Sequence, residues 1–428
     1  MTELLRTWRL LQQLRAHVHA DPQQLQNVQD SLLREALLHA YRYVPFYRKY
    51  WHEAGFDPRV VRGTQDLELV PIMTRQMART AAEQGELLTR KPDTHSGTTM
   101  TTTGSSGQPM RIVSGSGEQR LWRAQGLRIW FEHGYRWQHK KAQFNGQTGA
   151  RHFLQKFGIS RTEWIPTNVT AEQLSRRFIQ AKADWVITTP TVLRRLASTI
   201  SQRGICFHPP RAIFCQGEIT DQHTKELSEK IFGIFPIDVY TSTELGYVAW
   251  QCERREGLHI NADTHLLEVL HKGVAVSPGN LGNIVITDLH NRTMPFLRYD
   301  TGDLAIAGNG NCECGRKFPF LQSIEGRRRD TIQLEGRSKI TSRRLLDYLA
   351  PVLSPDAYRL HQVSATRFRL ELYLAANQLR NPSDTEAITK HLQRLLGNVD
   401  IFVETLTTAY ASGEKTYPLV SKLSSAIE

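Results

Sequence analysis

The run TTGSSG has the composition of a loop that binds phosphate. Glycine permits the backbone conformations that turn successive N–H groups toward an anion, and hydroxyl groups donate hydrogen bonds to phosphate oxygens. The same composition is typical of a polar hairpin that binds nothing, so the run alone leaves both interpretations open. Its candidate binding residues are Thr102, Thr103, Gly104, Ser105, Ser106 and Gly107.

A second polar stretch, VYTSTELG at residues 239–246, places a carboxylate at the end of a β-rich run. Glu244 in this position is suited to hold Mg²⁺ against a triphosphate, and the ring of Tyr240 is suited to stack on a purine. Thr243 followed by Glu244 also matches the start of a helix, which needs no ligand.

A third stretch, LRYDTGDLA at residues 297–305, is followed downstream by IEGRRRD at residues 324–330. Asp303 lies beside a glycine, where its carboxylate is suited to accept both hydroxyls of a ribose. Arg327 is suited to neutralise a phosphate or to bond the sugar. Each stretch taken alone is also an ordinary charged turn.

Four further residues could bind a metal. Three thiolates and one imidazole suit a tetrahedral Zn²⁺ ion, and they come from Cys252, His259, Cys312 and Cys314. The Cys-x-Cys spacing is tighter than the usual Cys-x-x-Cys, so spacing alone leaves free thiols and an ordinary histidine open. The five cysteines are an odd number and thinly spread, which argues against a disulfide framework.

The segments around these residues alternate between strand and helix patterns. Apolar runs at residues 183–190, 210–218 and 235–244 read as strands, and residues 191–204 and 220–233 have helical periodicity. This order predicts an α/β fold with mostly parallel strands, whose ligands gather at the carboxyl ends of the strands.

The two ends of the chain differ from this middle part. Helical periodicity marks residues 30–54, with a break at Pro45, and Pro71 and Thr74 mark a loop and a helix cap. Residues 266–304 form a β-rich subdomain, and the short strands and helices after Asp330 suffice for a small α+β domain. We therefore expect a large domain over residues 1–328 and a smaller C-terminal domain over residues 329–428.

Composition narrows the class of protein. The chain has 428 residues and a net charge of +12, which fits either anionic substrates or a solvated basic surface. No stretch approaches the ~18 apolar residues of a membrane span, and the mean hydropathy is −0.42. No nucleic-acid-binding module is recognised, and the charged, amphipathic N-terminus is unlike a secretory signal. We expect a soluble, cytoplasmic protein.

The order of the three polar stretches resembles that of the adenylate-forming enzymes, which include acyl-CoA ligases and peptide-synthetase adenylation domains. The segments HAYRYVPFYRKYWHEAGFDP, LVPIMTR and CECGRKFPFLQSIEGR are typical of the phenylacetate-CoA ligase and CapK branch. The resemblance extends from about residue 30 to the end of the chain. It implies a ligase with a large AMP-binding N-terminal domain and a mobile C-terminal domain.

The resemblance also implies a two-step reaction. A carboxylate attacks the α-phosphate of ATP to give an acyl-adenylate and pyrophosphate, and a thiol, usually coenzyme A, then displaces AMP. The loop of residues 102–107 would grip the β- and γ-phosphates, and Gly217, Glu218 and Tyr240 would surround adenine. Thr243 would contact the α-phosphate, and Glu244 would hold Mg²⁺. Asp303 would bind the ribose hydroxyls, and Arg327 would lie beside the ribose, near the hinge at Asp330. Some relatives bind a structural zinc where this chain has its three cysteines and His259.

Two departures from the family pattern stand out. Gln108 replaces the lysine that commonly follows the phosphate loop, and Glu414 is inserted between Gly413 and the expected catalytic lysine, Lys415. Lys422 is a weaker candidate for the catalytic lysine, and a solvated tail lysine is the remaining interpretation of Lys415.

Three functions remain open for the sequence. The first is ligation of an aryl or arylacetic acid to coenzyme A. The second keeps the adenylate but passes the acyl group to a carrier protein or an amine, or transfers the adenylyl group to a product. The third is a catalytically degenerate nucleotide-binding protein of polysaccharide biosynthesis. Relatives are often dimers, so a homodimer is also expected.

Overall fold

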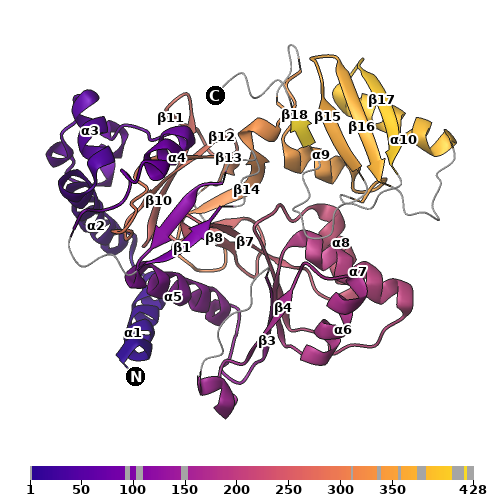
Figure 1. Cartoon of the computed structure of the whole chain (residues 1–428), viewed down its shortest axis with the longest axis horizontal. Helices are drawn as coiled ribbons and strands as arrows, with labels where there is room; N and C mark the ends of the chain where they lie inside the picture. Colours follow the sequence, from indigo (N-terminus) through magenta and orange to yellow (C-terminus); the bar gives the residue numbers. More distant parts are fainter. Residues whose placement is uncertain are drawn as a thin grey trace. The chain divides into compact units, whose positions relative to one another are not determined.

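The computed structural model describes residues 2–91, 97–102, 109–145, 153–309, 312–334, 339–354, 358–373, 382–406 and 419–421. The chain, whose helices and strands Figure 1 labels, divides into two compact units. The first unit comprises Met1–Tyr135 and Val239–Ser323, and the second comprises Arg136–Asp238 and Ile324–Glu428. Each unit is therefore assembled from two separate segments of sequence.

Helices dominate the N-terminal part of the first unit. The chain breaks between α2 and α3 as predicted, because Pro45 is the first residue of α3 and lacks the N–H that a continuous helix would need. Thr74 caps α4 as predicted, since its hydroxyl accepts a hydrogen bond from Met77 N at 3.2 Å. The helices are α1 (Thr2–His17), α2 (Pro22–Tyr43), α3 (Pro45–Glu53), η1 (Pro58–Val60), η2 (Thr64–Leu69), α4 (Arg75–Glu83) and α5 (Ser116–Glu132).

The strands of the first unit follow the order β11-β10-β12-β13-β14-β9-β8-β7, and β14 continues into the second unit. The pairs β10–β12 and β12–β13 are antiparallel, which confirms a β-rich subdomain over residues 266–304, and the pair β8–β9 is antiparallel as well. The strands are β7 (Ile237–Ser242), β8 (Gly246–Gln251), β9 (Leu258–Ile260), β10 (His265–His271), β11 (Val274–Ala275), β12 (Leu281–Asp288), β13 (Tyr299–Ala307) and β14 (Phe320–Arg327). A separate hairpin joins β1 (Thr98–Thr101) to β2 (Arg111–Ser114).

A parallel α/β layer forms the first half of the second unit. Its strand order is β6-β5-β3-β4, and all three pairings are parallel, as the alternation of strands and helices predicts. The elements are β3 (Lys141–Asn145), η3 (Phe153–Phe157), β4 (Thr162–Pro166), α6 (Ala171–Ala181), β5 (Trp185–Thr188), α7 (Pro190–Arg203), β6 (Ala212–Gln216) and α8 (Gln222–Phe232). The predicted α/β fold class is confirmed.

The second half of this unit is a four-stranded sheet of order β17-β16-β15-β18. Two helices supply apolar side chains to its core, among them Leu345 and Leu392, which are completely buried. The elements are η4 (Arg328–Asp330), α9 (Ser342–Leu349), β15 (Tyr358–Gln362), β16 (Arg367–Tyr373), α10 (Pro382–Leu396), β17 (Asp400–Leu406) and β18 (Leu419–Ser421). Nearly all residues of this core follow residue 330, although the contacts group them with residues 136–238. The division at residues 328 and 329 stays a prediction.

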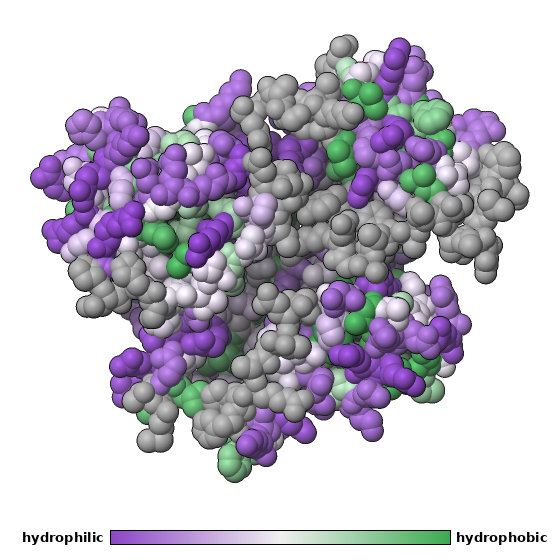
Figure 2. Space-filling model, in the orientation of Figure 1, coloured by the Kyte–Doolittle hydropathy of each residue, from purple (hydrophilic) through white to green (hydrophobic). Residues whose placement is uncertain are grey.

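Hydrophilic side chains predominate among the described residues on the face seen in Figure 2, and apolar side chains form only small patches there. Among the described residues, no helix is both long and apolar enough to cross a membrane.

Candidate active site and metal centre

The described part of the predicted phosphate loop is its first residue, Thr102. This residue is buried and is paired with Met110: Thr102 N donates to Met110 O at 2.9 Å, and Met110 N donates to the Thr102 hydroxyl at 2.8 Å. These bonds extend the β1–β2 hairpin to the base of the loop. The other loop residues lie outside the described residues: Thr103, Gly104, Ser105, Ser106, Gly107 and Gln108.

Tyr240, assigned to adenine, and Asp303, assigned to the ribose, lie together in the first unit. The Tyr240 hydroxyl, on β7, donates a hydrogen bond of 2.6 Å to Asp303 Oδ2, on β13. Gly302, whose φ is +76°, lies within β13 where its pairing with β12 is irregular, and Asp303 N donates to the Thr301 hydroxyl at 3.1 Å. The short bond to a charged acceptor holds the Asp303 carboxylate in one orientation.

Glu244 lies in the turn between β7 and β8, with Thr243 partly buried beside it. Its side chain is buried, and its Oε1 accepts from Arg75 Nη1 at 3.3 Å and from the Tyr299 hydroxyl at 3.4 Å. A buried carboxylate needs such partners because burial removes its hydration. The carboxylate chosen for Mg²⁺ is thus held in place by two other elements, α4 and β13.

Arg75 was not singled out from the sequence. Its Nη1 atom also lies 3.3 Å from Thr301 O and from the Tyr299 hydroxyl, so one guanidinium joins α4 to β13 and to Glu244. The only sequence signal was its place at the end of LVPIMTR, a segment typical of the phenylacetate-CoA ligase branch.

Arg298, which opens the RYDTGD motif, has a structural role. It adopts a φ of +45°, is buried, and donates to both carboxylate oxygens of Glu268 at 3.1 and 3.2 Å. It also bonds the carbonyl oxygens of Glu68 and Val70 at 2.6 and 2.7 Å. These bonds fix the segment that leads into Asp303.

Gly217 and Glu218, the other two residues assigned to the adenine region, follow β6 in the second unit. Gly217 has a φ of +81°, which a side chain would disfavour. The Glu218 carboxylate accepts from the backbone N and the hydroxyl of Thr191, at 3.1 and 2.6 Å, in the first turn of α7. Glu218 therefore supplies a hydrogen-bond acceptor to a backbone N–H group in the first turn of α7, a role that the sequence did not predict.

Arg327 ends β14, and Asp330 closes the short helix η4 that follows. Asp330 lies 3.4 Å from Arg329 Nε, and its backbone oxygen accepts from the Ser342 hydroxyl at 2.8 Å. Glu414, Lys415 and Lys422 lie outside the described residues. The predicted ribose contact of Arg327, the hinge at Asp330 and the catalytic role of Lys415 stay predictions.

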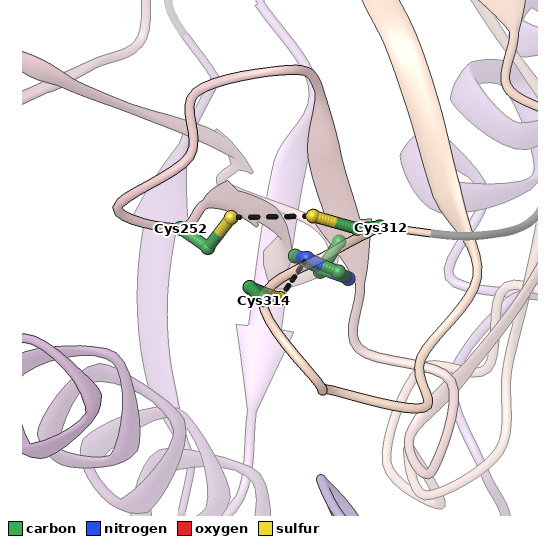
Figure 3. A group of neighbouring side chains, drawn as sticks. Cys252, Cys312 and Cys314 are labelled. Atoms are coloured by element: carbon green, nitrogen blue, oxygen red, sulfur yellow. Dashed lines mark hydrogen bonds between the residues drawn. The ribbon is translucent and has the colours of Figure 1, made fainter.

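The structure brings the four predicted metal ligands together in the first unit. Their ligand atoms all lie within 4.8 Å of one another, with Cys252 Sγ 3.7 Å from Cys312 Sγ and Cys314 Sγ 3.2 Å from His259 Nε2 (Figure 3). A tetrahedral zinc ion with Zn–S bonds of about 2.3 Å separates two sulfur ligands by about 3.8 Å. The observed separation of the two sulfurs therefore suits zinc.

The surroundings of these ligands suit a metal as well. His259 Nδ1 is bonded to Phe318 O at 3.0 Å, which leaves Nε2 for the sulfur side of the cluster, and burial lowers the pKa of His259, which favours the neutral ring that a metal ligand needs. Arg316 is held by Glu132 and Glu253, at 3.2 and 2.7 Å. Burial opposes ionisation of the Cys314 thiol, but hydrogen bonds from the backbone and guanidinium of Arg316 outweigh it and lower its pKa.

No protein-family model matches the chain. Among curated proteins, the chain is similar to phenylacetate-coenzyme A ligases. It is 27% identical to that of Thermus thermophilus over 333 residues, which is 73% of each chain. It is 25% identical to that of Aromatoleum evansii over 401 residues, which is 87% of this chain and 88% of the relative. The Escherichia coli enzyme is 25% identical over 347 residues, 74% of each chain.

Solved structures of acyl-CoA ligases share the fold. 2-Hydroxyisobutyryl-CoA ligase in complex with 2-HIB-AMP matches with a TM-score of 0.76 and 19% identity, over 96% of this chain and 93% of that one. Anthranilate CoA ligase in complex with anthranoyl-AMP matches with a TM-score of 0.55 and 14% identity, over 76% of this chain and 66% of that one. At these identities the likeness shows the fold and leaves the substrate open.

Proposed function

We propose that the chain, which is similar in sequence to phenylacetate-coenzyme A ligases and shares the fold of acyl-CoA ligases, activates a carboxylic acid with ATP and transfers the acyl group to coenzyme A. The similarity to phenylacetate-coenzyme A ligases over 73% to 87% of the chain carries this proposal. The relatives' names favour phenylacetate or another aryl or arylacetic acid as the substrate. They do not favour the two alternatives, another acceptor or a degenerate protein.

The proposed first step forms a bond between a carboxylate oxygen and the α-phosphorus of ATP and breaks the bond to pyrophosphate. No general base is needed because the acid is already ionised at neutral pH. The 102–107 loop would bind the β- and γ-phosphates, Thr243 the α-phosphate, and Lys415 would offset the charge that develops there. Gly217 and Glu218 would border adenine.

The Tyr240–Asp303 pair supports the assignment of the nucleoside. Its carboxylate is fixed at 2.6 Å by the tyrosine hydroxyl, so its orientation exists before ATP binds. We assign the ribose hydroxyls to Asp303 and place the tyrosine ring against adenine. Arg327 would contact the same ribose from the end of β14.

We assign Mg²⁺ to Glu244, where the ion would offset the charge of the phosphates. Carboxylate oxygen is the ligand that this ion prefers. The bonds from Arg75 and Tyr299 would hold the carboxylate ready for the ion.

In the second step the sulfur of coenzyme A would attack the acyl carbon, and AMP would leave with the electron pair of the broken C–O bond. We propose that residues 329–428 turn about Asp330 between the two steps, as the resemblance to the family implies. The core that residues 332–419 form largely among themselves supports this division.

We also propose that Cys252, His259, Cys312 and Cys314 hold a structural zinc ion. Four protein ligands fill a tetrahedral site and leave no position for water, so the ion would have no part in the reaction. It would tie the turn after β8 to the segment that precedes β14. Because the reaction consumes ATP and coenzyme A, we place it in the cytoplasm.

Pyrophosphate release tests the proposed function. Purified protein with MgATP and a panel of aryl, arylacetic and fatty acids should release pyrophosphate with at least one acid, and adding coenzyme A should give the thioester and AMP. Release without consumption of coenzyme A would indicate another acceptor. Absence of release with every acid would contradict the proposed ligase and favour the degenerate protein.

A further inference from the structure

Helix α9, in the second unit, carries two polar side chains that bind backbone groups of other segments of that unit. Arg343 donates from Nε to Ile324 O at 2.6 Å and from Nη1 to Thr220 O at 3.3 Å. Asp347 Oδ1 accepts from Gln222 N, the first residue of α8, at 2.9 Å. The backbone groups that α9 bonds belong to Ile324, Thr220 and Gln222, which all precede residue 330, whereas α9 follows it. These bonds therefore cross the proposed hinge.

Close packing accompanies these bonds. Gly326, at the end of β14, has a φ of +104°, and a Cβ atom there would lie 2.9 Å from Ser342 Cβ and 3.1 Å from Ile219 Cδ1. Ile219 also packs against the apolar core of the C-terminal sheet. The turn between β6 and α8 thus contacts both α9 and that core directly.

Charge also favours the bound position of α9. The Arg343 guanidinium lies 3.8 Å from Glu325 Oε1 and 3.9 Å from Asp238 Oδ2, and both carboxylates are buried. Asp238 also accepts a hydrogen bond from the Thr220 hydroxyl, and Glu325 accepts one of 2.6 Å from the Thr341 hydroxyl. If α9 moved away, both buried carboxylates would lose this cation, which is unfavourable.

We propose that Arg343 and Asp347 form a clasp that holds the residues after Asp330 in one of the two positions the reaction needs. The proposal rests on the proposed two-step function. A contact made in one position of a hinge stabilises that position alone, so it changes the balance between the two positions. Arg343 and Asp347 are then positioning residues for one half-reaction, and neither contacts the reacting atoms.

The expected change in the half-reaction rates follows from the strength of the hydrogen bonds that Arg343 makes. A hydrogen bond to a charged group is worth enough to shift an equilibrium by roughly tenfold to a hundredfold. Removing Arg343 should therefore change the ratio of the two half-reaction rate constants by about tenfold or more. The amide of Gln222 should exchange its hydrogen faster by a similar factor, because its acceptor is on α9.

The experiment compares Arg343→Ala and Asp347→Ala with Arg394→Ala, which changes an exposed arginine on α10. Hydrogen exchange is followed in peptides that contain residues 219–225. The rate of pyrophosphate release from acid and MgATP is measured separately from thioester formation, which starts when coenzyme A is added to preformed acyl-adenylate. We expect faster exchange and a changed rate ratio in both clasp variants, and wild-type values in the control.

Two outcomes would overturn the clasp. Exchange in residues 219–225 that matches the control would show that α9 is not held there. Faster exchange with an unchanged rate ratio would show a contact without a role in the reaction. If no acid supports pyrophosphate release, the proposed function fails, and the exchange data still decide whether the contact exists. Arg343→Gln replaces Arg343→Ala if the alanine variant does not fold.

Discussion

The hydrogen bond between Tyr240 and Asp303 gives a direct test of the nucleotide site. Tyr240→Phe removes one hydroxyl and keeps the ring, so stacking on adenine should persist. The lost bond has an ionised acceptor and a length of 2.6 Å. A net contribution of about 1.5–3 kcal/mol is expected for such a bond.

That free energy predicts the kinetic effect. If Asp303 binds ribose only when the tyrosine orients it, the KM for ATP should rise by about tenfold to a hundredfold. The turnover number should change less, because the ribose is bound equally before and during the reaction at phosphorus. Initial rates of pyrophosphate release at varied ATP concentration measure both constants.

Tyr50→Phe is the matched control. Its hydroxyl donates a bond of 2.8 Å to the backbone oxygen of Ile72 in the same unit, so the variant loses a tyrosine hydrogen bond that has no proposed role with ATP. We expect its KM for ATP to equal that of the wild type. A KM for ATP within twofold of wild type in Tyr240→Phe would refute the reasoning that the tyrosine orients Asp303 for the nucleotide.

Three further predictions concern the metal, the catalytic lysine and a buried lysine. Cys312→Ser should lower bound zinc from about one equivalent to near zero and lower the melting temperature; elemental analysis and calorimetry measure this, and a metal-free wild-type protein would disprove it. Lys415→Ala should abolish pyrophosphate release and leave ATP binding nearly intact by calorimetry, whereas unchanged turnover would exclude Lys415. Burial lowers the pKa of Lys141 to about 8, below that of an unfolded lysine, so the unfolded chain holds this proton more tightly. Between about pH 8 and pH 10.5, the free energy of unfolding should therefore rise by up to about 3 kcal/mol more in wild type than in Lys141→Met. Urea unfolding at several pH values measures this, and the same pH dependence of the free energy of unfolding in both proteins would contradict the prediction.

The local pattern of the sequence predicted the parallel layer well. Apolar runs and helical periodicity located β5, α7, β6, α8 and β7, because burial on a sheet or on one face of a helix acts on neighbouring residues. Proline and threonine likewise marked the ends of helices at Pro45 and Thr74. The expected boundary between residues 328 and 329 stays a prediction, because contacts between distant segments decide which residues form one compact unit.

The sequence identified most residues of the candidate site, but it did not predict which other residues they contact. Cys252, His259 and the Cys-x-Cys pair converge as their chemistry suggested, although 60 positions separate Cys252 from Cys312. Glu218 was assigned to the adenine region by the family resemblance, and in the structure its carboxylate bonds Thr191 in the first turn of α7. Arg75 was missed because it contacts Glu244 across 169 positions, and no local pattern shows such a pairing.

Glu244 and Asp303, the two buried acidic residues of the proposed nucleotide site, depend on the fold as well as on their motifs. Each motif supplies a carboxylate, but a carboxylate at 4% or 8% exposure is costly unless other groups bond it. Those groups come from outside the motif that holds each carboxylate: Tyr299 of the other motif and Arg75 of α4 bond Glu244, and Tyr240 of the Glu244 motif bonds Asp303. A related chain that kept both motifs but lost Arg75 should therefore bind MgATP more weakly, because its Glu244 carboxylate would lose one of these bonds.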